Sequence, residues 1–387
     1  MTEKDIYLDN SATSPPLPSV IDKVNEVLKY NYGNPSSLHN KGLKAEKIKK
    51  EACKKLIEKL NTSTNNFIFT SGGTESNNLA IKGIAYKYQN RGKHLITSLI
   101  EHPSVLNTFR YLEDKGFKVT YLKPDRWGII NPEKLKNALK ENTILVSIMH
   151  VNNELGSIQP IKQMAKFIKE LNPSPIFHVD AVQSFGKIRL NPKKMGIDLL
   201  TISAHKVHGP KGIGALYYND SLQLEPLLHG GGQEKGIRSG TENMPGIAGF
   251  IPAIEALPNF SKNNFQDKKI NKIKKYLIEK FKNNQNNLPE FRINTPLKCS
   301  APHIINISFA GLKGEVIVHS LESDGIYVST GSACHSRKNE QSEVLKAIGL
   351  AAKYKEGTIR ISLSRHITKK EIDVFLKSLI KNLEFIS

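Results

Sequence analysis

The sequence predicts an α/β fold in which helices cover a mainly parallel sheet. Short apolar runs, each about as long as a strand, alternate along the chain with segments of helical periodicity such as 104–115, 132–139 and 161–171. Parallel strands are joined by such helical crossovers, so the alternation favours a parallel sheet wrapped by helices. The apolar runs are 68–70, 95–100, 119–122, 144–149, 176–179, 199–203 and 215–218.

A change in composition at residues 258–264 predicts the boundary between two domains. This stretch is polar and follows a predicted helix near 247–257. Beyond it, the lysine-rich segment 268–282 has apolar residues at helical spacing and predicts an amphipathic helix, followed by strands and a final helix. The apolar stripe of the amphipathic helix consists of Ile270, Ile273, Leu277 and Phe281.

Length and cysteine content are typical of an intracellular enzyme. A chain of 387 residues is long enough for roughly two domains and a sizeable core. Its three cysteines have no paired spacing, which argues against a disulfide framework or a zinc site. Residues 1–5 form no apolar signal and no run approaches membrane-spanning length, so we expect a cytoplasmic protein with no membrane contact.

The net charge of +20 has two interpretations. We favour solvated helix faces, because lysines flank the apolar stripes of two predicted helices. The alternative is attraction to an acidic partner or to RNA, although the sequence contains no RNA-binding motif. The lysines assigned to solvated faces are Lys44, Lys47, Lys49, Lys50, Lys54, Lys55 and Lys59 in the first helix and those of 268–282 in the second.

Two charged residues are predicted at the carboxyl ends of neighbouring strands, where open α/β sheets bind ligands. Lys206 follows the apolar run 198–202, and a desolvated lysine there can form a Schiff base with a carbonyl. Asp180 ends the run 176–180, and a buried aspartate needs a cation such as a pyridinium nitrogen. Separately, Lys206 could be a solvated loop lysine and Asp180 a helix N-cap. Together they match what pyridoxal 5'-phosphate (PLP) requires.

A third strand end provides a candidate phosphate site. The sequence Ser-Gly-Gly-Thr-Glu-Ser at 71–76 follows the apolar run 66–70 and precedes a predicted helix. Gly73 allows main-chain amides to approach an anion, Thr74 adds a hydroxyl, and the helix N-terminus favours negative charge. The alternative is an ordinary turn from strand to helix in which Thr74 is the cap.

These motifs resemble those of cysteine desulfurases of the NifS/IscS type, in the class V branch of PLP-dependent fold-type I enzymes. The resemblance implies a large PLP-binding domain of residues 16–257 and a smaller α+β C-terminal domain of residues 258–387, joined by 1–15, that carries the catalytic cysteine loop. The matching segments extend along the chain: 7–10, 33–37, 71–78, 101–102, 151–154, 178–183, 203–212, 231–234, 238–243 and 331–334.

The resemblance also implies roles for individual residues. Lys206 would carry the cofactor and shift the substrate Cα proton, Asp180 would contact the pyridine nitrogen, and His102 would stack on the ring and carry protons. L-cysteine would be held by Arg360, Asn34 and Asn153. The residues expected around the rest of the cofactor are Asn153 and Gln183 near the ring hydroxyl and Gly73, Thr74, Ser203 and His205 at the phosphate. Thr241 would reach the phosphate of a neighbouring subunit, which implies a homodimer.

Cys334 defines the reaction that the resemblance implies. It follows a predicted strand at 325–328 and precedes residues 335–343, which include no apolar side chain, so we expect a mobile thiol. The Cys334 thiolate would attack the sulfur of L-cysteine, form a persulfide and release L-alanine. The sulfur would then pass to an acceptor protein for iron-sulfur cluster assembly or tRNA thiolation. Cys53 fits a buried helix position, and we assign no role to Cys299.

Two other classes of function remain open. A selenocysteine lyase or another class V aminotransferase-like PLP enzyme would share Lys206, Asp180 and Thr74, but a transaminase would not need the Cys334 loop. A scaffold or nucleic-acid-binding protein would have no use for Lys206. Retention of the cofactor spectrum with loss of turnover in Cys334→Ser would separate the first class from a desulfurase.

Overall fold

The computed structural model describes residues 5–62, 66–261, 265–331 and 342–386. Its largest sheet has seven strands, and strands β7, β6, β5, β3 and β4 run parallel to one another. Strand β8 is antiparallel to both of its neighbours, β2 and β7. The prediction of a mainly parallel sheet is confirmed. In spatial order the strands are β2 (Phe67–Thr70), β8 (Gly214–Tyr218), β7 (Leu199–Ser203), β6 (Ile176–Asp180), β5 (Thr143–Met149), β3 (His94–Ser98) and β4 (Lys118–Leu122).

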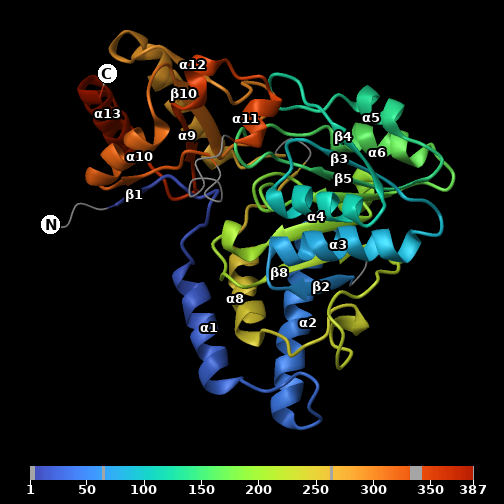
Figure 1. The fold of residues 1–387 in the computed structure, drawn as a ribbon. Coiled ribbons are helices and arrows are strands. Elements are labelled where there is room, and N and C mark those ends of the chain that lie inside the picture. Colours follow the sequence, from blue (N-terminus) through green and yellow to red (C-terminus); the bar gives the residue numbers. More distant parts are fainter. Residues whose placement is uncertain (1–4, 63–65, 262–264, 332–341, 387) are drawn as a thin grey trace.

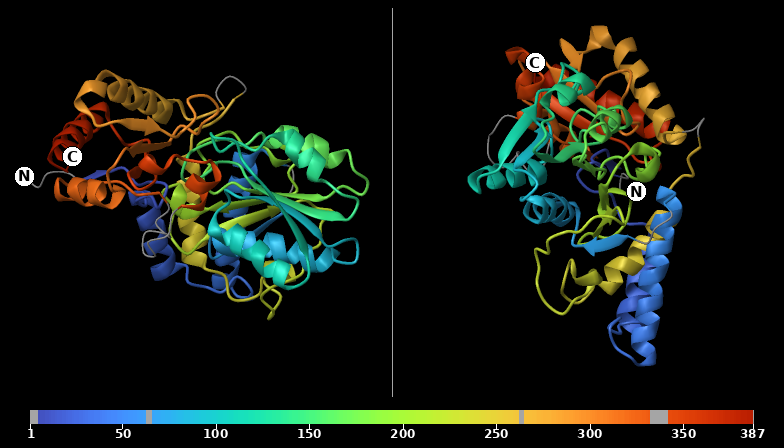
Figure 2. Two further views of the ribbon diagram at one scale, coloured as in Figure 1. Left: turned by 45° about the horizontal axis from the view of Figure 1, so that its top comes forward. Right: turned by 90° about the vertical axis from the view of Figure 1, so that its right-hand side faces the viewer.

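Helices cover both faces of this sheet (Figures 1 and 2). Successive strand side chains point to opposite faces, and in β2, Ile68 packs into one core whereas Phe67 and Phe69 pack into the other. The face of Ile68 is covered by α3 (Gly73–Tyr88) and α4 (Pro103–Asp114). The opposite face is covered by α2 (Asn40–Leu60), α5 (Pro132–Ala138), α6 (Ile161–Lys169) and α8 (Met244–Glu255).

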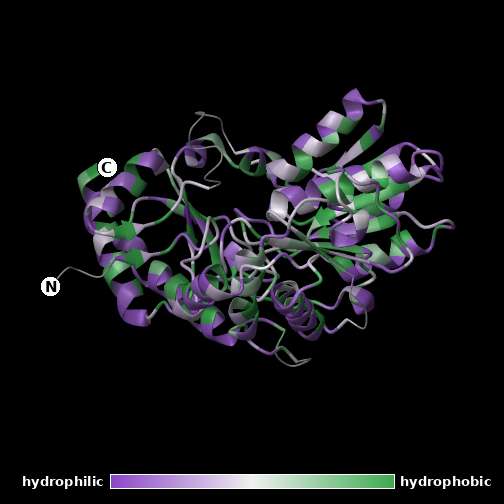
Figure 3. Ribbon diagram, turned by 90° about the horizontal axis from the view of Figure 1, so that it is seen from below, coloured by the Kyte–Doolittle hydropathy of each residue, from purple (hydrophilic) through white to green (hydrophobic). Residues whose placement is uncertain are grey.

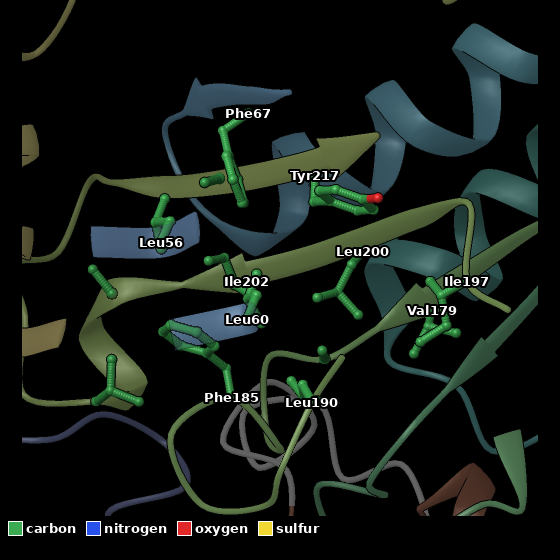
Figure 4. Packing of buried hydrophobic residues seen from close by; sticks show 14 of the residues in the cluster. Leu56, Leu60, Phe67, Val179, Phe185, Leu190, Ile197, Leu200, Ile202 and Tyr217 are labelled. Carbon is green, nitrogen blue, oxygen red and sulfur yellow. The ribbon is translucent and has the colours of Figure 1, made fainter. Parts of the chain in front are cut away.

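The core under α2 fixes the strands that end at the candidate site. Figure 4 shows Leu56 and Leu60 of α2 close to Ile202 and Phe185, and all four side chains are at most 1% exposed. Because β6 and β7 pack against this core, their carboxyl ends lie at fixed positions at one edge of the sheet.

The C-terminal elements form a second group around a separate core. A three-stranded antiparallel sheet has the order β12 (Thr358–Ser362), β10 (Ile304–Phe309) and β9 (Phe291–Ile293). The predicted apolar stripe of α9 (Lys268–Asn283) is buried in this core, as expected. Helices α10 (Gly314–Ser323) and α13 (Lys369–Ile386) also contribute to it.

The N-terminal strand belongs to this second group. Strand β1 (Ile6–Tyr7) pairs in parallel with β11 (Ile326–Tyr327), and Ile6 and Leu8 pack in the C-terminal core. Figure 1 places β1 beside α10 and α13. Because the C-terminal elements and β1 share a core of their own, we retain as a proposal the division into a domain of residues 16–257 and a domain of residues 258–387 with 1–15.

Helices α1 (Pro18–Tyr30) and α2 pack against α8, and the end of each that adjoins residues 31–39 projects from the molecule in Figure 1. The remaining short helices are α7 (Pro192–Met195), α11 (Glu343–Ala347) and α12 (Ala352–Lys355). Within the described ranges, no helix is both long and apolar enough to cross a membrane.

The prediction of solvated lysines is partly wrong. Hydrophilic and hydrophobic residues alternate along the outer helices in Figure 3, and most lysines of α2, such as Lys44 and Lys47, are exposed. The Lys49 ammonium instead forms ion pairs of 2.7 and 2.9 Å with Glu234 and Glu242. Lys274 of α9 is 4% exposed. Helical spacing does not distinguish a solvated position from one that a distant loop covers.

Candidate active site

A cavity of about 270 Å³ opens at the carboxyl ends of β6 and β7. Its wall includes side chains from strand ends, from two helix N-termini and from β12, which lie far apart in the sequence. The structure therefore brings together most of the residues selected from the sequence. Those that line the cavity are Gly73, Thr74, His102, Asn153, Asp180, Gln183, Ser203, His205, Lys206 and Arg360.

Lys206 ends a short 3-10 turn, Ala204–Lys206, directly after β7. Its Nζ donates hydrogen bonds to the main-chain oxygens of Ser11 and Ala12, at 2.7 and 2.6 Å. The segment that follows β1 therefore holds the amine in the cavity. Sequence reasoning missed Ser11 and Ala12, because a main-chain acceptor leaves no residue-type signal.

Asp180 ends β6 and is 6% exposed. Its Oδ1 accepts a hydrogen bond from the Val182 main-chain N–H at 2.9 Å, and its Oδ2 accepts one from Asn77 Nδ2 at 2.8 Å. The Asn77 amide also donates to Ser104 Oγ at 2.9 Å. Among the described residues, Asp180 takes part in no ion pair. A buried carboxylate held only by neutral donors is suited to a cation that enters the cavity.

A second cavity, of about 330 Å³, adjoins the first where α3 begins. Gly72 has φ +152°, and a Cβ on Gly73 would lie 2.9 Å from the Val182 side chain, so both glycines are needed for this turn. The buried Ser203 Oγ has no hydrogen-bond partner within the described part of the chain. Together with Lys211 these groups offer an anion both main-chain amides and positive charge.

His205 lines both cavities. Burial lowers the pKa of its imidazole to about 4, and the nearby Lys206 and Lys211 add to the shift. The ring is therefore neutral at pH 7 and contacts Thr13 Oγ1 through Nδ1 at 3.2 Å. A neutral imidazole offers one donor and one acceptor to a ligand.

His102 is the N-cap of α4. Its Nδ1 accepts the main-chain N–H of Ser104 at 3.1 Å and lies 2.8 Å from Ser104 Oγ. Because Nδ1 is an acceptor, a neutral ring carries its proton on Nε2. Ser104 thus joins His102 to the Asn77–Asp180 pair, a connection that the sequence did not indicate.

Glu101 directly precedes His102 in the chain and is 2% exposed. It accepts hydrogen bonds from the Met149 main-chain N–H at 2.8 Å and from Ser98 Oγ. Burial raises its pKa to about 8, and repulsion by Asp180 contributes. Glu101 is therefore a neutral carboxylic acid at pH 7 that links β3 to β5. Sequence analysis had assigned it no role.

Arg360 enters the cavity from β12 and is 2% exposed. One terminal nitrogen donates to the Asn153 main-chain oxygen at 3.0 Å, and the other pairs with Asp9 Oδ1 at 2.7 Å. The buried Nε has no hydrogen-bond partner among the described residues. The guanidinium is thus held in place by two contacts, neither of which was predicted.

Gln183 is fixed by contacts with residues from both groups of elements. Its Nε2 donates to the Ser11 main-chain oxygen at 3.0 Å, and its Oε1 lies 3.3 Å from His303 Nε2. Asn153 is 8% exposed and lines the same cavity.

Two predicted residues, Asn34 and Thr241, do not line this cavity. Asn34 is exposed in the segment between α1 and α2. Thr241 is also exposed and lines a different cavity of about 250 Å³, beside Ser71. Cys334 lies outside the described residues.

The chain is similar to known proteins over nearly its whole length. The family model described as aminotransferase class-V matches residues 6–375. A relative named "Cysteine desulfurase IscS" from Dictyoglomus turgidum is 42% identical over 383 residues, which cover 99% of this chain and 95% of the relative. A protein of the same name from Clostridium botulinum is 43% identical over 381 residues, 98% of this chain and 94% of the relative.

Solved structures lead to the same family. One described as "NIFS-LIKE PROTEIN" has a TM-score of 0.90 and 38% identity, and the match covers 99% of this chain and 100% of that chain. Another, described as "SspA in complex with cysteine", has a TM-score of 0.82 and 37% identity over 94% of this chain and all of the other. The predicted fold-type I architecture is thereby confirmed, and the chain belongs to the aminotransferase class-V family, within its NifS/IscS cysteine desulfurase group.

Proposed function

We propose that the chain is a PLP-dependent cysteine desulfurase that converts L-cysteine to L-alanine and transfers the sulfur to an acceptor. One observation carries the proposal: the amine of Lys206 and the carboxylate of Asp180, from neighbouring strand ends, line the same cavity. Relatives named cysteine desulfurase, similar over nearly the whole chain, support it.

The residues present fit PLP. Asp180 lacks an ion pair among the described residues and is suited to a protonated pyridine nitrogen. At the start of α3, Gly73 leaves no space for a Cβ, and Ser203 Oγ, which has no hydrogen-bond partner in the described ranges, is available to a phosphate. Lys206 would hold the cofactor covalently, His102 would lie against its ring, and Thr74, Ser203 and His205 would hold its phosphate. When bound, the group provides an electron sink for the substrate α-carbon.

The other steps belong to the side chains of the cavity. Lys206 Nζ, oriented by the oxygens of Ser11 and Ala12, would act as the base that moves the substrate Cα proton. His102 would hold a proton at Nε2 and deliver it to the carbon that is released when the carbon–sulfur bond breaks. Arg360 would bind the substrate carboxylate with its remaining donor capacity. Asn153 and Gln183 would orient the substrate amine.

Cys334 would receive the sulfur. Its thiolate would attack the sulfur of L-cysteine, the carbon–sulfur bond would break, and its electron pair would be protonated at carbon to give L-alanine. The product on the protein is a persulfide; one proton is taken up at carbon, and no oxidant or reductant is needed. We propose that this sulfur passes to an acceptor protein for iron-sulfur cluster assembly or tRNA thiolation. The support for Cys334 is the sequence segment 331–334.

We also propose that the protein is a homodimer. Asn34 and Thr241 are exposed and lie outside the cavity of their own chain, as expected if a second copy uses them. Large apolar side chains of α1 and of the segment that follows it are exposed as well and would be covered by that copy. They include Ile21, Leu28, Tyr30, Tyr32 and Leu38. Sedimentation analysis of the purified protein should give the mass of a dimer, and a fully active monomer would contradict this proposal.

Mass spectrometry tests the two covalent assignments. Borohydride reduction of the PLP-treated protein should attach the cofactor to the Lys206 peptide, and Lys206→Ala should lose both the adduct and turnover. After exposure to L-cysteine, sulfur should be added to the Cys334 peptide.

A cysteine variant provides the control. Cys334→Ala should bind PLP and L-cysteine but release almost no alanine, whereas Cys299→Ala should behave as wild type. Sulfur on Cys53 or Cys299, or full alanine production by Cys334→Ala, would instead favour a lyase that needs no enzyme thiol, such as a selenocysteine lyase.

A further inference from the structure

Ser11 lines the cavity at the carboxyl ends of β6 and β7, and its side-chain hydroxyl is not used by the fold. The residue is 1% exposed. Its main-chain N–H donates to Ser362 Oγ at 2.8 Å, and its main-chain oxygen accepts from Gln183 Nε2 at 3.0 Å and from Lys206 Nζ at 2.7 Å. The buried Oγ forms no hydrogen bond with any residue that the structure describes. Because a buried hydroxyl without a partner costs free energy, this one is suited to a group that enters the cavity.

Arg360 lines the same cavity and has a second unpaired donor. Its terminal nitrogens contact Asp9 and the Asn153 main-chain oxygen, but its buried Nε–H has no partner within the described ranges. Residues two apart on a strand share a face, so Arg360 and Ser362 of β12 point the same way. The hydrogen bond from Ser11 to Ser362 therefore holds Ser11 beside the strand that carries Arg360. Two unpaired donors, one of them charged, provide a site for an anion.

The position of these donors favours a carboxylate of the substrate over the phosphate of the cofactor. Ser11 and Arg360 line only the cavity of about 270 Å³. The side chains suited to a phosphate, such as Thr74 and Ser203, line this cavity and also the adjoining one where α3 begins. Ser11 also holds the Lys206 amine through its main-chain oxygen, so it lies near the point at which a substrate α-carbon would lose its proton. In an α-amino acid the carboxylate is bonded to that carbon.

We propose that Ser11 is a further substrate-binding residue: its hydroxyl donates a hydrogen bond to the α-carboxylate of the amino acid, beside the Arg360 guanidinium. The inference rests on the proposed function, because that function places the substrate α-carbon at Lys206. One carboxylate oxygen takes the Arg360 Nε–H and the other takes the Ser11 hydroxyl, so both unpaired donors are satisfied. The main-chain oxygen of Ser11 keeps its separate contact with the Lys206 amine.

Two ligands that differ only in the carboxylate test this contact: L-alanine, the product of the proposed reaction, and ethylamine. Each is titrated into the PLP-loaded protein, and binding is followed in the absorption spectrum of the cofactor. We expect Ser11→Ala to bind L-alanine about tenfold more weakly than wild type, because a hydrogen bond to a charged group is lost. Its affinities for ethylamine and for PLP should equal those of wild type. An equal loss of affinity for both ligands, or no loss for either, overturns the proposal.

The stability of the cofactor-free protein distinguishes a hydroxyl that binds substrate from one that supports the fold. Ser11→Ala removes a buried hydroxyl without a partner, so the urea midpoint should stay constant or rise. Ser14→Ala is the contrast, because Ser14 Oγ donates to the His205 main-chain oxygen at 2.8 Å and accepts the His208 N–H at 2.7 Å. That variant should have a lower midpoint. A lower midpoint in Ser11→Ala, with equal losses of affinity for both ligands, would make its hydroxyl structural and overturn the proposal.

Thr62→Val is the matched control. The Thr62 hydroxyl is also buried and has no partner in the part of the chain that the structure describes, but it lines neither cavity. Thr62→Val should therefore keep the affinities of wild type for L-alanine and ethylamine. If it loses affinity for L-alanine as Ser11→Ala does, the effect does not come from a contact in the cavity, and the proposal is overturned.

The outcomes separate this inference from the proposed function. If borohydride reduction places PLP on Lys206 in wild type and in Ser11→Ala, and both bind L-alanine equally well, only the role of Ser11 fails. If wild type yields no adduct on Lys206, the proposed function fails and the role of Ser11 fails with it.

Discussion

Replacement of Glu101 by glutamine should change how the stability of the protein depends on pH. In the folded protein Glu101 keeps its proton up to about pH 8, whereas an unfolded glutamate releases it near pH 4.5. Its contribution to stability is therefore complete below pH 4.5 and is lost as the pH rises toward 8, at about 1.4 kcal/mol per unit. Between pH 6 and pH 8 wild type should lose about 2 kcal/mol through this group, and by pH 9 about 3 kcal/mol. Glutamine is neutral, can accept the Met149 N–H and can donate to Ser98 Oγ, so Glu101→Gln should lack this loss.

Urea unfolding of wild type and Glu101→Gln at pH 6 and pH 9 measures this difference. The unfolding free energy of the variant minus that of wild type should grow by about 3 kcal/mol from the lower to the higher pH. Glu51→Gln, on an exposed face of α2, is the control and should follow wild type at both values. A difference that is equal at pH 6 and pH 9 would mean that folded Glu101 is already ionised at pH 6, and the argument from burial would be refuted.

Three further substitutions test the site and the cores. Asn77→Leu removes a 2.8 Å hydrogen bond to Asp180 and should weaken PLP binding about tenfold in an equilibrium titration; an unchanged affinity would exclude a role for that contact. Lys49→Met leaves two buried carboxylates without their shared cation, so thermal unfolding should show a loss of about 3 kcal/mol, and a loss below about 1 kcal/mol would contradict this. Phe281→Ala should cost about 3–5 kcal/mol because the side chain is fully buried, whereas Phe385→Ala, 91% exposed, should cost almost nothing; similar losses would show that α9 is not part of a tight core.

The sequence predicted the parts of the site that local patterns encode. Apolar runs followed by polar residues identify strand ends, and such ends in a parallel sheet meet at one edge. Lys206, Asp180 and the turn at 71–76 therefore line two adjoining cavities at this edge of the sheet. The parallel sheet and the apolar stripe of α9 follow from periodicity in the same way.

The parts that were not predicted depend on contacts between distant segments. In the sequence, nothing distinguishes Asn77 from other helical residues. Its amide reaches Asp180 only because α3 packs over β6. Ser11 acts through a main-chain oxygen, which every residue type possesses. Lys187 and Lys274 look like surface lysines in a lysine-rich chain, and only tertiary packing buries them.

The ion pair between Asp9 and Arg360 also determines when the cavity can be completed. These residues are 351 positions apart, and Asp9 immediately precedes the segment whose oxygens hold the Lys206 amine. A chain emerging from the ribosome folds its early parts first. The sheet can therefore form while the segment near Asp9 still lacks its cationic partner. Cofactor capture should consequently be a late event in biosynthesis, delayed until Arg360 has been synthesised and β12 has joined its sheet.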